Sequence, residues 1–201
     1  MSGSSLEQID GRTARRDRNR VAVLDAVLAL FVDDVDPTPE NVALRCGLSP
    51  RSVYRYFEDR DELLRAAIER QLELIYPLQL IEALGHGTLD ERVQRFVAAR
   101  VSLYVAVAPL ARAARRRVSK NAAIGEQLRA TRRTLREQVE LQFARELGAL
   151  VTSQRRDALS AIDALSQFES LEYFTETLAL SPAVLRSLLA RSTHSLLTPT
   201  T

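Results

Sequence analysis

Hydrophobic residues recur three and four positions apart through most of the chain, with polar residues between them. One such stripe consists of Val21, Leu24, Val27, Leu28 and Phe31, and another of Leu64, Ile68, Leu72 and Ile75. This spacing follows the 3.6-residue period of an amphipathic helix. No segment alternates convincingly between polar and apolar residues as a half-buried strand would. The pattern therefore predicts an all-α protein.

Helix boundaries are marked by hydroxyl or amide residues that can cap a helix, by prolines and by glycines. Thr88 with Glu91 has the spacing of a capping box, and Pro77 and Pro109 are expected to end or bend a helix. The first dozen residues are expected to lack regular structure. The helices expected from these signals cover residues 15–32, 39–46, 50–57, 60–76, 88–107, 109–119, 121–147, 152–178 and 182–197.

The segment 38–57 has the pattern of two short helices joined by a tight turn. Thr38 and Ser49 are each followed by proline, as at a helix N-cap, and Gly47 can adopt the left-handed conformation that ends the first helix. The second helix would bury Val53 and Phe57. Its exposed face would carry Arg51, Ser52, Tyr54, Arg55 and Tyr56. Such a face suits phosphates and base edges, so the segment is interpreted as a helix-turn-helix; the alternative is a helical hairpin with a basic, solvated face.

The run GLSPRSVYRYFEDRDELL at residues 47–64 resembles the signature of the tetracycline-repressor (TetR) family of transcriptional regulators. In that family an aromatic pair closes the recognition helix, and a polar turn with an acidic cap opens the next helix. The resemblance covers the first third of the chain. It implies an N-terminal arm and DNA-binding domain at 1–60, a linker helix at 61–84 and a ligand-binding and dimerisation domain at 85–201.

The resemblance also implies roles for individual residues of the DNA-binding domain. Arg51 and Ser52 match positions that face base edges, whereas Tyr54, Tyr56 and Arg60 match positions that hold phosphates. Thr38 matches a phosphate-contacting cap. A helix N-terminus carries partial positive charge and free N–H groups, which agrees with that role. One of the two tyrosines is expected to be partly buried.

Two segments near this motif allow more than one interpretation. Residues 33–37, DDVDP, are more acidic than the family pattern; we expect a solvated loop that points away from DNA, the alternative being a metal-binding motif. The arginine-rich arm between Arg12 and Arg20 would either contact DNA, in a minor groove or along phosphates, or remain a solvated tail.

In the larger C-terminal region, Arg100 shares a helical stripe with apolar residues, so its guanidinium is expected to point inward. A buried arginine requires an acceptor, which would be an acid such as Glu169 or Glu172, or an anionic ligand. A pocket of mainly aliphatic character is expected because aromatic residues are only 5% of the chain. Its candidate lining is Tyr76, His86, Phe96, Arg100, Tyr104, Gln142 and Phe143, for each of which plain core or rim is the alternative.

The last two predicted helices carry wide apolar faces. One face consists of Ala158, Ala161, Leu165, Phe168, Leu171 and Phe174, and the other of Leu185, Leu188, Leu189 and Leu196. Faces of this width favour burial on two sides, against the core and against a two-fold copy in a four-helix interface. The family resemblance implies the same homodimer.

Composition narrows the class of protein. The chain has 46% hydrophobic and 27% charged residues, a net charge of +2, one cysteine and two histidines, which fits a soluble globular protein without a disulfide framework or zinc cluster. No apolar run reaches the ~20 residues that span a bilayer, and the N-terminus lacks the apolar core of a secretory signal. We expect a cytoplasmic protein that has no membrane segment and needs no metal or cofactor.

The function expected from these observations is a homodimeric DNA-binding regulator, a repressor that responds to a small-molecule effector and is not an enzyme. One alternative is a non-inducible architectural DNA binder or helical adaptor. Another is an all-α metal-dependent enzyme with the DDVD segment as its metal site and Arg100 as its substrate anchor, although a nucleophile–base pair is missing.

Overall fold

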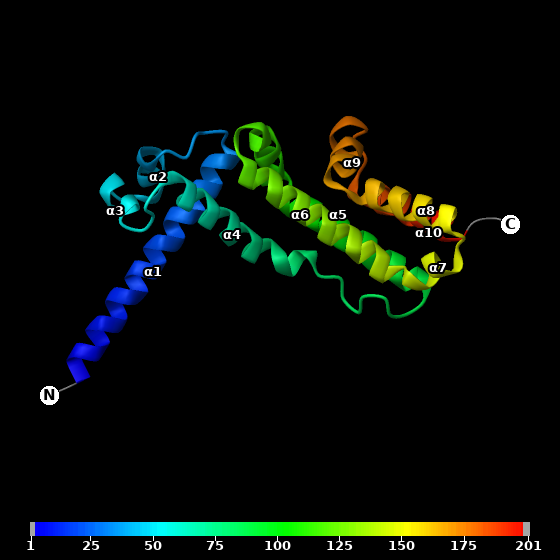
Figure 1. The fold of residues 1–201 in the computed structure, drawn as a ribbon, viewed down its shortest axis with the longest axis horizontal. Coiled ribbons are helices and arrows are strands. Elements are labelled where there is room, and N and C mark those ends of the chain that lie inside the picture. The colour runs from blue at the N-terminus through cyan, green and yellow to red at the C-terminus, as the bar shows by residue number, and fades with distance from the viewer. Residues whose placement is uncertain (1–2, 199–201) are drawn as a thin grey trace. The chain divides into compact units, whose positions relative to one another are not determined.

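A computed structural model of the chain describes the backbone of residues 3–198 and the side chains of 13–119 and 121–198. The described residues form helices and connecting turns and contain no strand, which confirms the predicted all-α fold (Figure 1). The α-helices are α1 (Gly3–Val32), α2 (Pro39–Cys46), α3 (Pro50–Tyr54), α4 (Arg60–Gln79), α5 (Leu89–Arg117), α6 (Ala122–Gln142), α7 (Ala144–Ala149), α8 (Thr152–Ser166), α9 (Phe168–Glu172) and α10 (Pro182–Leu197). A 3₁₀ turn, η1 (Val118–Lys120), follows α5, and a π-helical turn, η2 (Tyr173–Thr177), follows α9.

The chain divides into two compact units. The first consists of residues 1–73 and 109–124, and the second of residues 74–108 and 125–201. Helices α4, α5 and α6 each contribute residues to both units.

The core of the first unit is formed by α1 to α4. Buried apolar side chains come from α1, from the short helices α2 and α3 with the residues that follow α3, and from the first turns of α4. These side chains are Val23, Val27, Phe31, Val42, Ala43, Val53, Phe57, Leu63 and Ala67. The first unit therefore has an apolar interior to which all four helices contribute, and the polar face of α3 lies outside it.

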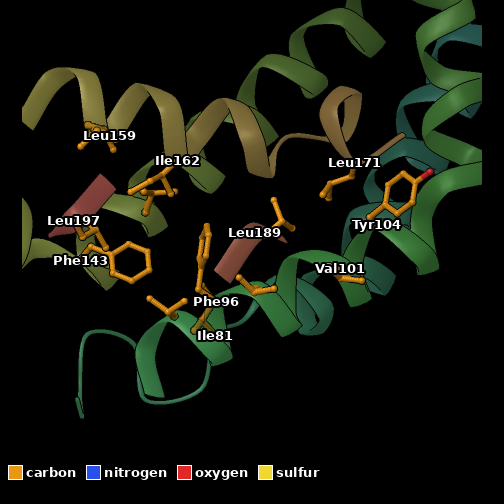
Figure 2. Packing of buried hydrophobic residues seen from close by; sticks show 14 of the residues in the cluster. Ile81, Phe96, Val101, Tyr104, Phe143, Leu159, Ile162, Leu171, Leu189 and Leu197 are labelled. Atoms are coloured by element: carbon orange, nitrogen blue, oxygen red, sulfur yellow. The ribbon is translucent and has the colours of Figure 1, made fainter. Parts of the chain in front are cut away.

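The core of the second unit gathers side chains from α5, α6, α8, α9 and α10 (Figure 2). The rings of Phe96 and Phe143 meet edge to face with centroids 5.3 Å apart, and both side chains are buried. Ile162, Leu185 and Leu189 close the cluster from α8 and α10. Burial of this many large side chains is the main stabilising contribution in the unit.

Helix α5 is, among the described helices, the one that is long and apolar enough to cross a bilayer by length and composition. Of its apolar window 44% is buried inside the protein, where it supplies Phe96, Val97 and Val101 to the core. A helix in the core of a globular protein can have the same length and apolar composition, so these two features alone do not indicate a membrane segment.

Two prolines lie inside helices instead of ending them. Pro109 was expected to separate two helices, but α5 continues through it from Leu89 to Arg117. Pro77 lies within α4, which extends to Gln79. Pro109 leaves the carbonyl of Val105 without its helical donor, and because Val105 is 61% exposed, water can satisfy that carbonyl.

Other predicted boundaries were also wrong. Helix α1 begins at Gly3, not near residue 15, and α3 ends at Tyr54, not at Phe57. The expected helix 121–147 is interrupted at Phe143, whose φ of −119° and ψ of 25° are not helical. The expected helix 152–178 is interrupted at Gln167, where ψ is 157°, and it begins after Val151 without the expected hydroxyl cap.

Candidate nucleic-acid interface

The turn between α2 and α3 has the geometry that its sequence predicts. Thr38 Oγ1 accepts a hydrogen bond from Asn41 N at 3.3 Å, and Ser49 Oγ accepts one from Ser52 N at 3.2 Å. Gly47 has a φ of 69°, a conformation that glycine adopts without strain, and Leu48 N donates back to the carbonyl of Ala43 at 3.0 Å. Both caps and the left-handed turn are confirmed, and together they fix the orientation of α3.

The outer face of α3 carries the residues expected to contact DNA. Val53 and Phe57 are buried, whereas Arg51 is exposed and Tyr54 is 56% exposed. Ser52 is half-buried, and its hydroxyl lies 2.9 Å from that of Ser49. Arg51 and Tyr54 therefore present their side chains to solvent, and Ser52 shares its hydroxyl with the helix cap.

Tyr56 is the partly buried member of the tyrosine pair, as expected. Its hydroxyl accepts hydrogen bonds from Asn19 Nδ2 at 3.3 Å and from Arg55 Nη2 at 3.1 Å. Burial raises the pKa of Tyr56, but these two hydrogen bonds and the charges of Arg55 and Arg16 outweigh burial, so that its pKa lies below the usual 10.0. The phenol therefore lies in a positively charged environment made by α1 and the end of α3.

The basic face of α1 adds to the positive charge around the Tyr56 phenol. The sequence predicted these arginines only as an N-terminal arm, not as one face of a helix. Arg15, Arg16, Arg18 and Arg20 are exposed, and the guanidinium of Arg20 lies 5.3 Å from the ring centroid of Phe57. The side chain of Arg12 falls outside the described residues. Asn19 was missed as a site candidate; its spacing of four residues from Arg15 and three from Arg16 on one helix was the available signal, whereas Arg16 was considered only as part of the arginine-rich arm.

The acidic turn, defined as residues 33–37, is occupied by arginines from three helices. Asp33 pairs with Arg45 of α2, and Asp36 pairs with Arg60 at the start of α4. Asp34 pairs with two arginines of α5, Arg117 through Nη2 at 3.0 Å and Arg116 through Nε at 3.5 Å. The carbonyl of Asp36 accepts a hydrogen bond from Asn41 Nδ2 at 2.9 Å. The described residues hold no group of three or more metal-ligating side chains. Each carboxylate of this turn thus has a guanidinium partner, which weighs against the metal-site alternative.

Arg60, one of the expected phosphate contacts, is therefore committed to Asp36 in this structure. Both side chains are about half exposed, and an exposed pair of this kind contributes little to stability. The pairing still lowers the positive charge that Arg60 offers to a phosphate.

The six candidate pocket residues of the second unit do not share one environment. Phe96 and Phe143 contact each other in the core, while Tyr76 is 62% exposed. Gln142 is buried and bridges two backbone groups, since its Oε1 accepts from Gly85 N at 2.8 Å and its Nε2 donates to the carbonyl of Arg92 at 2.7 Å. Tyr104 is buried with its hydroxyl 2.6 Å from Thr175 Oγ1. Gln142 and Phe143 thus have structural roles in this unit, and His86, also considered for the rim, is exposed.

Arg100 points inward, as predicted, and is only 2% exposed. Its hydrogen bonds go to Gln138 Oε1 and to the carbonyl of Leu135, both at 2.9 Å. Of the two acids that the sequence suggested as partners, Glu169 binds Arg132 instead. Sequence reasoning missed Gln138, and it also missed Arg92, which is equally buried and binds Glu146.

Comparisons with known proteins agree with this geometry. Residues 24–67, which span the helix-turn-helix and the start of α4, match the family model described as bacterial regulatory proteins, tetR family. The crystal structure of a proposed TetR-family transcriptional regulator from Rhodococcus sp. is similar in fold, with a TM-score of 0.67 and 16% sequence identity over 90% of this chain and 100% of that chain. No curated protein matches the chain significantly. The resemblance stated from residues 47–64 is thereby confirmed, because the segment that carries the exposed face of α3 matches the model of the tetR family of bacterial regulatory proteins.

Proposed function

We propose that this protein is a homodimeric transcriptional repressor that binds a near-palindromic DNA operator and releases it when a small molecule binds the second unit. The observation that carries the proposal is the exposure of Arg51 and Tyr54 on a capped, rigidly positioned α3. The family match over residues 24–67 supports the DNA-binding part. Repression and the response to an effector extend beyond that match.

Within the DNA-binding unit, we assign two kinds of contact. Arg51 contacts a base edge, and Ser52 lies beside it. The commonest base-specific contact of arginine is a bidentate pair of hydrogen bonds to guanine. The phosphate contacts are assigned to Thr38, Tyr54, Tyr56 and Arg60. Arg16 and Arg55, whose charges act on the Tyr56 hydroxyl, are assigned to phosphates as well. Phosphate contacts set the register of α3 in the major groove, and the base contact supplies sequence preference.

The test is selection of bound sequences from random duplex DNA, followed by titration of the best sequence with variants. R51A and Y54A are expected to weaken binding to that sequence, R51A by the ~1–3 kcal/mol of a bidentate base contact. R133A, which removes an exposed arginine from α6 in the second unit, is the matched control for net charge. Affinity unchanged in both R51A and Y54A would reject α3 as the DNA reader.

The homodimer is proposed through the last two long helical segments, α8 and α10. Leu165 and Leu188 on these helices are only half-buried, and Val184 is 50% exposed, so apolar surface remains for a partner. Pairing of two such helices with their two-fold copies makes a four-helix interface. Two recognition helices on one face of DNA would then read half-sites about 34–36 Å apart. Sedimentation at micromolar protein, together with the half-site spacing of the selected sequences, tests this assembly.

Binding of the effector and binding of operator DNA must affect each other reciprocally. If a ligand lowers operator affinity by some factor, operator DNA lowers ligand affinity by the same factor. A cytoplasmic, non-enzymatic regulator of this kind needs no cofactor. Operator binding that stays constant while a ligand saturates the second unit would leave a non-inducible DNA binder as the function.

A further inference from the structure

Helix α5 carries two buried arginines, Arg92 and Arg100, both 2% exposed. Arg92 has a full counter-charge: its Nη1 lies 2.8 Å from Glu146 Oε2, and its Nη2 lies 2.5 Å from Glu146 Oε1. Arg92 Nη1 also donates to the carbonyl of Gln142 at 2.7 Å. This bidentate pair is the usual way in which a protein stabilises a buried guanidinium.

Arg100 lacks such a counter-charge. Its two hydrogen bonds go to neutral oxygens, Gln138 Oε1 and the Leu135 carbonyl, and its guanidinium lies 4.8 Å from the ring centroid of Phe96. Among the described residues no carboxylate lies within ion-pair distance of it. The acid that acts on it at longer range is Asp163, which is already bound by Arg136 at 3.1 Å and by Gln167 at 2.6 Å.

The charge of Arg100 nevertheless persists at neutral pH. Burial lowers its pKa to about 10, an effect that the charge of Asp163 opposes, so the guanidinium stays protonated. The Nε atoms of Arg92 and Arg100 both lack a hydrogen-bond partner, so the counter-charge is what distinguishes the two residues. A buried cation without a counter-ion is costly, and a residue of this kind in a ligand-responsive protein indicates a binding role.

We propose that Arg100 binds the anionic group of the effector and that the effector is an amphipathic carboxylate. This inference rests on the effector-responsive function proposed above. The carboxylate would supply the missing negative charge, and the surroundings require an apolar body, because Phe96, Val101 and Tyr104 on the same helix point into the hydrophobic cluster (Figure 2).

Gln138 connects this site to α4. Its Oε1 accepts from Arg100 Nη1, and its Nε2 donates to the carbonyl of Gln79, the last residue of α4, at 3.0 Å. A carboxylate forms charge-assisted hydrogen bonds that are roughly twice as strong as those of a neutral amide oxygen. The ligand therefore displaces Gln138 from Arg100, and the displaced amide gives up the end of α4. Helix α4 begins at Arg60, directly after the DNA-reading segment, so this exchange alters the restraint on the helix that follows that segment.

The first experiment compares thermal unfolding of R100M with that of R92M, without ligand or DNA. Because methionine removes an uncompensated charge at Arg100, R100M is expected to unfold at the same temperature as the wild type or higher. R92M leaves Glu146 unpaired and is expected to lower Tm by roughly 6–15 °C. A loss of Tm in R100M as large as that in R92M, or failure of R100M to fold, would show that Arg100 is structural and would overturn the proposal.

The second experiment measures the Tm shift caused by sodium octanoate against octan-1-ol, a neutral molecule of the same chain length. Octanoate is expected to raise Tm of the wild type in a dose-dependent way and octan-1-ol to raise it less. Q138E places a carboxylate beside Arg100 permanently, so octanoate should no longer shift its Tm. An equal effect of the two probes, no effect of octanoate on the wild type, or an undiminished shift in Q138E would each contradict an anion site at Arg100.

Q138E also tests the coupling. Glutamate cannot donate to the Gln79 carbonyl, so Q138E should bind the selected DNA several-fold more weakly than the wild type does without ligand. Unchanged DNA affinity in Q138E would exclude the Gln138–Gln79 link as the route. The Tm measurements contain no DNA, so they test the anion site alone. If the wild type fails to bind DNA, the proposed function is rejected, whatever the Tm measurements show.

Discussion

Asp34 and Arg117 lie 83 positions apart in sequence, and Arg117 Nη2 is 3.0 Å from Asp34 Oδ1. Asp34 has a φ of 59°, in the left-handed region that aspartate and asparagine tolerate best among residues with a side chain. Arg117 also donates to the carbonyl of Phe31 at 3.3 Å and lies 4.9 Å from its ring centroid. Arg117 thus connects the C-terminal end of α5 to the end of α1, together with Arg116, whose Nε lies 3.5 Å from the same Asp34 oxygen.

Arg117 should therefore contribute more to stability than Asp34. D34N keeps the backbone conformation and removes an exposed charge, so it should lower the free energy of unfolding by less than about 1 kcal/mol. R117A also loses the Phe31 contacts and should cost about 1–2 kcal/mol. Urea unfolding of both variants and the double variant measures the difference. A cost of R117A no greater than that of D34N would show that the Phe31 contacts contribute nothing.

Asp36 should limit DNA binding by occupying Arg60. D36N frees the Arg60 guanidinium for a phosphate and is expected to raise operator affinity roughly two- to fivefold, the range of an exposed ion pair. The same substitution in an R60A background should change nothing. Fluorescence anisotropy at fixed salt measures both. Equal gains with and without Arg60 would mean that Asp36 acts only through general repulsion of DNA.

Arg16 is expected to contact a phosphate beside Tyr56. R16A should weaken binding to all duplex sequences by a similar factor and reduce the slope of log affinity against log salt by about 0.9, the value for one phosphate. Tyr56 should also show a phenol pKa closer to its ordinary value in R16A, since the Arg16 charge lowers it. An unchanged salt slope in R16A, measured beside R133A, would place Arg16 away from DNA.

Glu146 should make stability depend on acid pH. Its hydrogen bond from Arg92 holds its pKa below the usual 4.5, an effect that burial opposes. Because the folded pKa is lower than the unfolded one, the stabilisation is fully present above pH ~4.5 and is lost as pH falls through the folded pKa. E146Q should cost about 3 kcal/mol at pH 7 by leaving Arg92 unpaired, and the difference from wild type should shrink in acid. Urea unfolding between pH 3 and 7 tests this; a difference constant with pH would exclude the linkage.

Features set by neighbouring residues were predictable from sequence. The caps at Thr38 and Ser49 and the left-handed turn at Gly47 depend on contacts within four residues, and the structure confirms them. The inward direction of Arg100 followed from its helical stripe. These features can be read locally because the same few residues both signal and form them.

Features that depend on distant residues were not predictable. Residues 33–36 of the acidic turn are exposed, as expected, but its arginine partners could not be predicted, because Arg45, Arg60 and Arg117 lie up to 83 positions away in sequence. The breaks at Phe143 and Gln167 carry no proline or glycine. The helix is interrupted at Phe143, where the ring packs against Phe96, so tertiary packing overrides the local helix propensity there.

Pro109 offers a direct test of how packing carries α5 through an unfavourable residue. P109A restores the N–H that can donate to the Val105 carbonyl and removes the clash of the ring with that turn, together worth ~3 kcal/mol in a helix interior. The variant also gives the unfolded chain more freedom, which offsets about 0.4–1 kcal/mol, and solvation of the exposed Val105 turn reduces the gain further. We expect net stabilisation of about 1–2 kcal/mol in urea unfolding. P109G, which gains the same N–H but adds the flexibility of glycine, should recover less. If P109A destabilises the protein, the proline itself is required for the packing of the first unit, to which residues 109–117 belong.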